Sequence, residues 1–192
     1  MNHEWGNSVT EISFLTGELF FAGIWLLCRT AVWIRQGKID WKREAALLLM
    51  AINLAVLIRF VFFPFFTVEG KVQPLVLGRT MQSPVRFNLV PFVLLTDYDV
   101  KKEAVINIVG NVALFIPTGI LLPILYPHLR SFRKTVLIGA GISLAIELIQ
   151  LLFPNSTSDV DDLLLNTLGV VLGWGIYSLF RRPRSTAEKS KS

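Results

Sequence analysis

Carboxylate, amide and hydroxyl side chains recur at helical spacing in the second half of the chain. Ser143, Glu147 and Gln150 are separated by four and three residues, so they share one face of a helix. Asn107 and Asn111 share a face in the same way. Carboxylates can bind a ligand, serve as general acids or bases, or coordinate a hard cation. These side chains are therefore the first candidates for a functional site.

A second polar group lies in the sequence PNSTSDVDD, which contains Asp159, Asp161 and Asp162, with Asn166 one turn beyond. One Asp is enough to cap a helix N-terminus, where free N–H groups and the helix dipole favour a carboxylate. Three Asp residues together with Glu147 could also coordinate a divalent cation through oxygen ligands. The chain has no His–Cys cluster, so zinc is not expected. The sequence is therefore compatible with either a helix cap or a cation site.

Long apolar blocks must position these residues. Hydrophobic residues make up 53% of the chain and charged residues only 17%, whereas a soluble domain carries about 25% charged residues. Five blocks come close to the ~20 residues that a helix needs to cross a bilayer: 12–34, 45–66, 104–126, 135–153 and 163–180. A soluble bundle is disfavoured because few polar faces remain to meet water. The sequence predicts an all-α polytopic membrane helix bundle with about five transmembrane helices and a long outer loop.

The distribution of Lys and Arg predicts how this bundle is oriented. With the N-terminus outside, twelve of the nineteen basic residues fall in inside segments, five fall in the outer loop 67–103, and two fall within spans. This bias follows the positive-inside rule. The net charge of +5 is then explained by topology and by contact with anionic inner-leaflet lipid, rather than by nucleic-acid binding. We expect one membrane domain over 1–181 and a basic cytoplasmic tail over 182–192.

The outer loop contains an apolar run, residues 87–95, that is too short to cross a membrane. Such a run either lies in or re-enters the membrane interface, or it forms a buried strand of the loop. The sequence does not separate the two.

One polar or charged residue on each span lies at a similar depth. With a helix rise of ~1.5 Å per residue, these residues lie roughly 5–10 Å from the outer ends: Glu18, Arg59, Asn111, Glu147 and Asn166. Charges in hydrocarbon usually face a cavity or a partner. We expect Arg59 to pair with Glu147, or with Glu18 as the second choice. The alternative is a buried ion pair that only fixes helix register.

Two further features concern packing. Gly169 and Gly173 are four residues apart, which would let another helix approach closely. Pro117 lies within the third apolar block, where it frees a backbone carbonyl and kinks a helix.

Four ordered motifs resemble the VanZ-like family: RFNLVPF at 86–92, NIVGNVALFIPTG at 107–119, SLAIELIQ at 143–150 and DVDDLLLNTLG at 159–169. The resemblance covers a core of about residues 86–180. The family is named for low-level resistance to teicoplanin, a lipid-tailed glycopeptide that acts on cell-wall precursors outside the membrane. The resemblance implies a similar antibiotic-resistance role in the envelope of a bacterium, in its cytoplasmic membrane. Family members often carry an Arg shortly before the Asp-rich stretch, where this chain has NSTS. If that Arg binds an anion in the family, either Arg86 or Arg59 replaces it here, or this chain does not bind the anion.

Two functions fit this resemblance and these residues. One is binding of a lipid-linked cell-wall precursor, or of the lipoglycopeptide itself, at the outer face. The other is a membrane-embedded hydrolase or transferase, with or without a divalent cation, acting on a lipid-linked substrate. No nucleophile–base pair is readable, which slightly favours binding and leaves enzymatic activity open. A transporter is a weaker third interpretation, since no paired inverted repeat is visible.

The expected partners are membrane lipids and one of these lipid-linked ligands, and no nucleic acid. The candidate ligand-binding residues are Arg59, Arg86, Asn88, Asn107, Asn111, Glu147, Gln150, Asp159, Asp162 and Asn166. Glu147, Asp159 and Asp162 are the candidates for catalysis, and the same three with Asp161 are the candidates for binding a metal.

Overall fold

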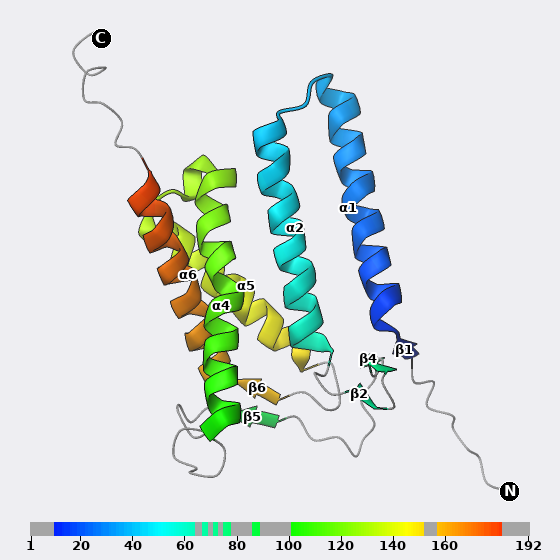
Figure 1. The fold of residues 1–192 in the computed structure, drawn as a ribbon, viewed down its shortest axis with the longest axis vertical. Helices are drawn as coiled ribbons and strands as arrows, with labels where there is room; N and C mark the ends of the chain where they lie inside the picture. Colours follow the sequence, from blue (N-terminus) through cyan, green and yellow to red (C-terminus); the bar gives the residue numbers. More distant parts are fainter. Residues whose placement is uncertain are drawn as a thin grey trace, which may run out of the picture.

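A computed structural model describes residues 10–63, 67–68, 71–72, 75–77, 86–88, 101–151 and 157–181. Five α-helices dominate these residues (Figure 1): α1 (Phe14–Gln36), α2 (Trp41–Phe62), α4 (Lys101–Leu125), α5 (Phe132–Gln150) and α6 (Val160–Phe180). A short 3-10 helix, η2 (Pro127–Leu129), precedes α5. The predicted all-α class is confirmed. The proposed tail 182–192 lies outside the described residues.

Alternate helices run in opposite directions. The starts of α1, α4 and α6 and the ends of α2 and α5 lie at one end of the bundle (Figure 1). We call this the strand end, because the short strands lie there, and we call the other the turn end, where residues 37–40 and 126–131 connect the helices. α1, the 105–125 part of α4, and α6 are long and apolar enough to cross a membrane. The chain is therefore a membrane protein, and a multi-pass arrangement fits it.

The strands form three short pairs. β1 (Thr10–Ile12) pairs with β4 (Leu75–Leu77), and β2 (Thr67–Val68) pairs with β3 (Lys71–Val72), both antiparallel. β5 (Arg86–Asn88) pairs in parallel with β6 (Thr157–Asp159). The start of the apolar run 87–95 thus lies in a loop strand, which was one of its two predicted forms; residues 89–95 lie outside the described residues.

Short polar side chains determine where several helices begin. Ser13, Asp40 and Ser131 each accept a hydrogen bond from a backbone N–H in the first turn of α1, α2 and α5. Such caps satisfy N–H groups that a helix start leaves without intrahelical partners. α1 ends at Gly37, whose φ of 64° is a left-handed conformation that glycine adopts at low cost. The turn between α1 and α2 is therefore encoded locally.

Close packing of α4 against α6 depends on glycine. A side chain at Gly169 would collide with the Val112 carbonyl of α4, and one at Gly173 would collide with the Ile116 carbonyl. The predicted role of these glycines in helix approach is confirmed. Gly119 of α4 meets α6 in the same way.

The core extends from this contact. Leu57 of α2, Phe115 of α4 and Val170 of α6 form one buried cluster. A second cluster, Ala46 with Leu121 and Leu125, lies nearer the turn end. By contrast, no residue of α1 is buried. Among the described helices, α1 lies along α2, and the tightly packed part of the bundle is α2 with α4, α5 and α6 (Figure 1).

Candidate functional site

Glu147 connects α5 to the start of α6. Its side chain is only 4% exposed, and its Oε2 accepts a hydrogen bond of 3.0 Å from the backbone N–H of Asp159, the last residue of β6. Asp159 in turn accepts through Oδ1 from the Asp161 N–H, at 2.9 Å, and is the N-cap of α6. The predicted capping role of the Asp cluster is confirmed for Asp159. A buried carboxylate therefore fixes the point at which the strand becomes a helix.

Asn111 of α4 makes a polar contact with α6 and another with Asn107 of its own helix. The Asn111 Nδ2 group donates to Asn107 Oδ1 at 2.6 Å and to Asp162 Oδ1. Asn111 and Asp162 are part-buried at this contact. The Asn111 amide thus donates to one carboxylate oxygen of Asp162, in the first turn of α6. The contact between Asn107 and Asn111 is the one expected from their i, i+4 spacing on α4.

A third contact lies one turn deeper, between Ser143 of α5 and Asn166 of α6. The Asn166 Nδ2 group donates to Ser143 Oγ at 2.9 Å. Ser143 is fully buried and Asn166 is 3% exposed. The other amide atom, Asn166 Oδ1, is buried and accepts no hydrogen bond from the described residues.

The structure thus brings most predicted site residues together on α4, α5 and α6 at the strand end: Asn107, Asn111, Glu147, Asp159, Asp161, Asp162 and Asn166. Gln150 is the last residue of α5 and lies at the same end. Arg86 and Asn88 belong to β5, whose backbone pairs Arg86 with Thr157 and Asn88 with Asp159. Their side chains lie outside the described part of the chain.

Arg59 lies in the last turn of α2, at the strand end, and its side chain contacts α1. Its Nη1 donates to the Phe63 carbonyl at 3.0 Å. Its guanidinium lies 5.3 Å from the centre of the Phe14 ring of α1 and 5.8 Å from that of Phe60. These are cation–π distances. The pairing with Glu147 or Glu18 stays a prediction.

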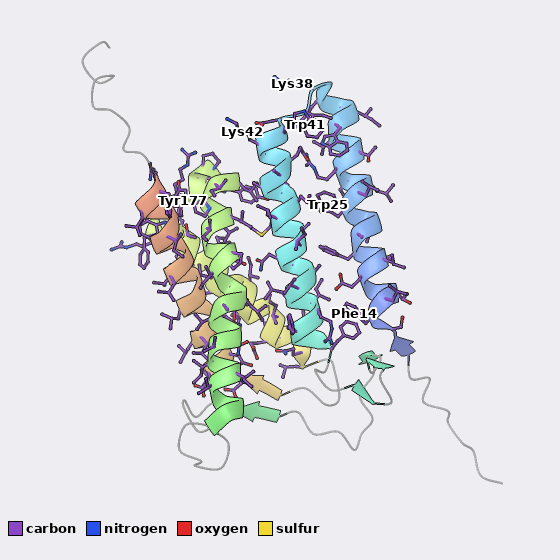
Figure 2. All side chains as sticks on the ribbon, viewed as in Figure 1. Phe14, Trp25, Lys38, Trp41, Lys42 and Tyr177 are labelled. Carbon is purple, nitrogen blue, oxygen red and sulfur yellow. The ribbon has the colours of Figure 1, made fainter. Side chains whose placement is uncertain are left out.

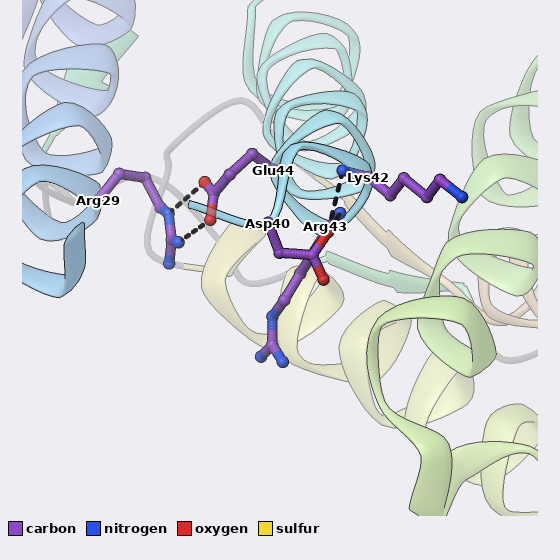
Figure 3. A network of polar contacts seen from close by, with 5 residues as sticks. All are labelled: Arg29, Asp40, Lys42, Arg43 and Glu44. Atoms are coloured by element: carbon purple, nitrogen blue, oxygen red, sulfur yellow. Dashed lines mark hydrogen bonds and ion pairs between the residues drawn. The ribbon is translucent and has the colours of Figure 1, made fainter. Parts of the chain in front are cut away.

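Two polar contacts were not predicted. Arg29 of α1 and Glu44 of α2 form an ion pair near the turn end (Figure 3). Within the bundle, Asn53 of α2 donates to the Leu114 carbonyl at 3.0 Å and accepts from the Thr118 hydroxyl at 2.8 Å. Both had a signal in the sequence: opposite charges on either side of a short turn, and one amide in the middle of an apolar block.

Across the described residues, no group of three or more His, Cys, Asp or Glu side chains is arranged so that it could hold a metal ion. With Asp159 accounted for as a cap, Asp161, Asp162 and Glu147 are left as the other candidates. Binding of a divalent cation stays a prediction.

Comparison with known proteins gives a family. The family model described as VanZ/LLP1 matches residues 48–181, which include most of α2 and all of α4, α5 and α6. Protein VanZ of Enterococcus faecium is 29% identical over 131 residues, which cover 68% of this chain and 72% of that protein. No solved structure matches the chain. The family match spans every helix of the polar cluster, and the chain belongs to the VanZ/LLP1 family.

Proposed function

We propose that this protein confers low-level, VanZ-type resistance to teicoplanin from a bacterial cytoplasmic membrane. It does so by binding the head group of a lipid-tailed molecule, either a lipid-linked cell-wall precursor or the lipoglycopeptide itself. The binding site is the polar cluster at the strand end. This end faces outward, the N-terminus is outside and the C-terminus is inside.

One observation carries this proposal: a buried polar cluster lies directly beside apolar surface. Glu147 and Asn166 are almost completely buried, while the flanking faces expose Ile106 and Val109 of α4 and Leu148 of α5. Polar groups at membrane depth are costly and are usually functional. A site that offers hydrogen bonds next to surface suited to acyl chains fits a ligand with a polar head and a lipid tail.

The charge distribution supports the orientation. Lys38 and Lys42 lie at the turn end, opposite the strands (Figure 2). Arg133 and Lys134 begin α5 at that end, and Arg181 follows α6 there. A cytoplasmic turn end would satisfy the positive-inside rule. The polar cluster would then face the side on which glycopeptides meet their targets.

The test is drug susceptibility with Glu147→Gln and Asp162→Asn. Both changes keep an oxygen that can accept from the Asp159 N–H or from Asn111, so we expect expression and melting temperature to be retained. Both remove a negative charge, and we expect teicoplanin resistance to fall to that of cells lacking the protein.

The matched control is Asp40→Asn, the same chemical change at the N-cap of α2, where Asn caps as well as Asp. It should leave resistance unchanged. Full resistance in well-folded Glu147→Gln and Asp162→Asn proteins would show that the cluster is structural and would exclude the proposed binding site.

A further inference from the structure

Asn166, at the centre of the polar cluster, has a buried hydrogen-bond acceptor that no described residue satisfies. Its Nδ2 group donates a hydrogen bond to Ser143 Oγ, but its Oδ1 is buried and has no donor among the described residues. A buried acceptor without a partner is unfavourable and is uncommon in folded proteins. At 3% exposure, bulk water does not reach the side chain freely. The amide is therefore arranged to accept a hydrogen bond that the described residues do not supply.

Asp162 lies one turn before Asn166 on the same face of α6. Among the described residues, the charged groups that act on it are Glu147, Asp159 and Asp161, all of the same sign. Within the same part of the chain, Asn111 donates a hydrogen bond to it. Across the described residues, Asp162 forms no ion pair with a Lys or Arg. A carboxylate with like-charged neighbours and one neutral donor attracts a positive charge.

These two observations define which ligand group fits the site. The group must carry a positive charge that pairs with Asp162, and it must donate hydrogen bonds to both Asp162 and Asn166. A primary ammonium group is compact and carries three N–H donors. A trimethylammonium group has the charge but no donor, and a sugar hydroxyl has a donor but no charge. We infer that the site holds a primary ammonium group on the head group of a membrane lipid, an inference that rests on the proposed function.

The position of the site favours a lipid as the carrier. Asp162 is the third residue of α6 and Asn166 the seventh, so with a rise of ~1.5 Å per residue they lie roughly 3 and 9 Å along the helix from its start. Head groups occupy the outer ~5–7 Å on each side of the hydrocarbon core. Leu164 and Leu168 of the same helix are exposed and can contact acyl chains. A lipid amine can therefore reach Asp162 while its chains stay in the bilayer.

The test uses purified full-length protein and four lipids with identical acyl chains: phosphatidylethanolamine, its N-methyl and N,N-dimethyl derivatives, and phosphatidylcholine. Lipid occupancy is measured by native mass spectrometry. We expect affinity to fall with each methyl group, and phosphatidylethanolamine to bind about tenfold more tightly than phosphatidylcholine, as for a charged hydrogen bond.

Asp162→Asn should abolish this preference, and Asp40→Asn should keep it. Should Asp162→Asn fail to fold, Asn166→Leu, which removes the acceptor without a change of charge, should weaken the preference.

Equal affinity for all four lipids in the wild type overturns the inference, as does a preference that survives both site variants. Displacement of phosphatidylethanolamine by millimolar magnesium would indicate an inorganic cation site and would also overturn it. Free ethanolamine that competes as well as the lipid would overturn the assignment to a lipid. If the wild type shows no lipid preference but Asp162→Asn loses resistance, the inference fails and the proposed function stands. If the wild type prefers phosphatidylethanolamine but Asp162→Asn keeps full resistance, the proposed function alone fails.

Discussion

Asn53 and Asn166 both lie in apolar helices, but they serve different purposes. Asn53 uses both amide atoms, one on the Leu114 carbonyl and one on the Thr118 hydroxyl. That carbonyl lies close to Pro117, whose missing N–H interrupts the hydrogen-bond ladder of α4. Asn166 uses one amide atom and leaves the other for a ligand in our proposal. Stability measurements should therefore separate the two residues.

We predict that Asn53→Leu lowers the stability of the purified protein by about 1–3 kcal/mol, because it leaves the Leu114 carbonyl and the Thr118 hydroxyl without their buried partner. The double variant Ser143→Ala/Asn166→Leu removes both members of a buried pair and should cost much less. Thermal unfolding in detergent gives both values. An Asn53→Leu protein that melts like the wild type would contradict this account of the α2–α4 contact.

The ion pair between Arg29 and Glu44 is the other residue-scale feature with a clear energetic consequence. The two side chains are 14% and 11% exposed, and the Arg29 Nε donates to Glu44 Oε2 at 3.0 Å (Figure 3). Removing one partner leaves a nearly buried charge without compensation. We predict that Arg29→Gln or Glu44→Gln each costs up to about 3 kcal/mol, and that the exchange Arg29→Glu/Glu44→Arg recovers part of the loss. Unfolding of the four proteins forms a double-mutant cycle, and additive single effects would exclude coupling.

At the scale of helices, the α4–α6 contact sets the distance across which Asn111 reaches Asp162. The contact is close because Gly169 and Gly173 have no side chains to separate the backbones. Asp162 and Asn166 lie on the same helix, only a turn or two toward the strand end. Widening the glycine contact would therefore also disturb the polar cluster.

We predict that Gly173→Ala lowers stability by about 1–3 kcal/mol, because the new methyl group would overlap the Ile116 carbonyl of α4. Gly175→Ala, two residues further along the same helix, meets no atom within 4 Å. Alanine has the higher helix propensity, so that control should be neutral or slightly stabilising. Melting temperatures of the two variants test the prediction, and equal values would contradict it.

The helices and much of the polar cluster could be predicted from the sequence, because both depend on local spacing. The apolar blocks predicted the five described helices. The i, i+4 pattern predicted that Ser143 and Glu147 share one face of α5, and both side chains are buried there. Four helices begin three or four residues before their predicted starts. In α2 the additional first turn, residues 41–44, is stabilised by the Asp40 cap and by the ion pair of Glu44. The pairing of β5 with β6 could not be predicted, since it joins segments far apart in the chain.

At the scale of the whole molecule, the two ends of the bundle differ in chemistry. The strand end holds the acidic and amide cluster, and the turn end holds basic residues such as Lys38 and Lys42 (Figure 2). Placing the basic end in the cytoplasm follows from the positive-inside rule. This orientation can be measured without knowledge of the ligand.

We predict that a membrane-impermeant thiol reagent labels Thr157→Cys but not Lys38→Cys in intact cells, and labels both after the cells are opened. The natural Cys28 is first replaced by Ser, because it is an exposed thiol. Lys38 lies at the turn end and β6 at the strand end, so one reagent reports on both sides. Labelling of position 38 alone in intact cells would reverse the orientation and place the polar cluster on the cytoplasmic side.

The parallel pairing of β5 with β6 has a consequence for biosynthesis. The two strands are separated by about seventy residues, and helices α4 and α5 lie between them in the chain. During synthesis, β5 emerges from the ribosome long before its partner and must wait while two further helices enter the membrane. Asp159, which ends β6, also donates its backbone N–H to Glu147 and caps the N-terminus of α6. The polar cluster is therefore completed only when α6 inserts, so a nascent chain arrested before that point would contain four of the five described helices but not the complete polar cluster.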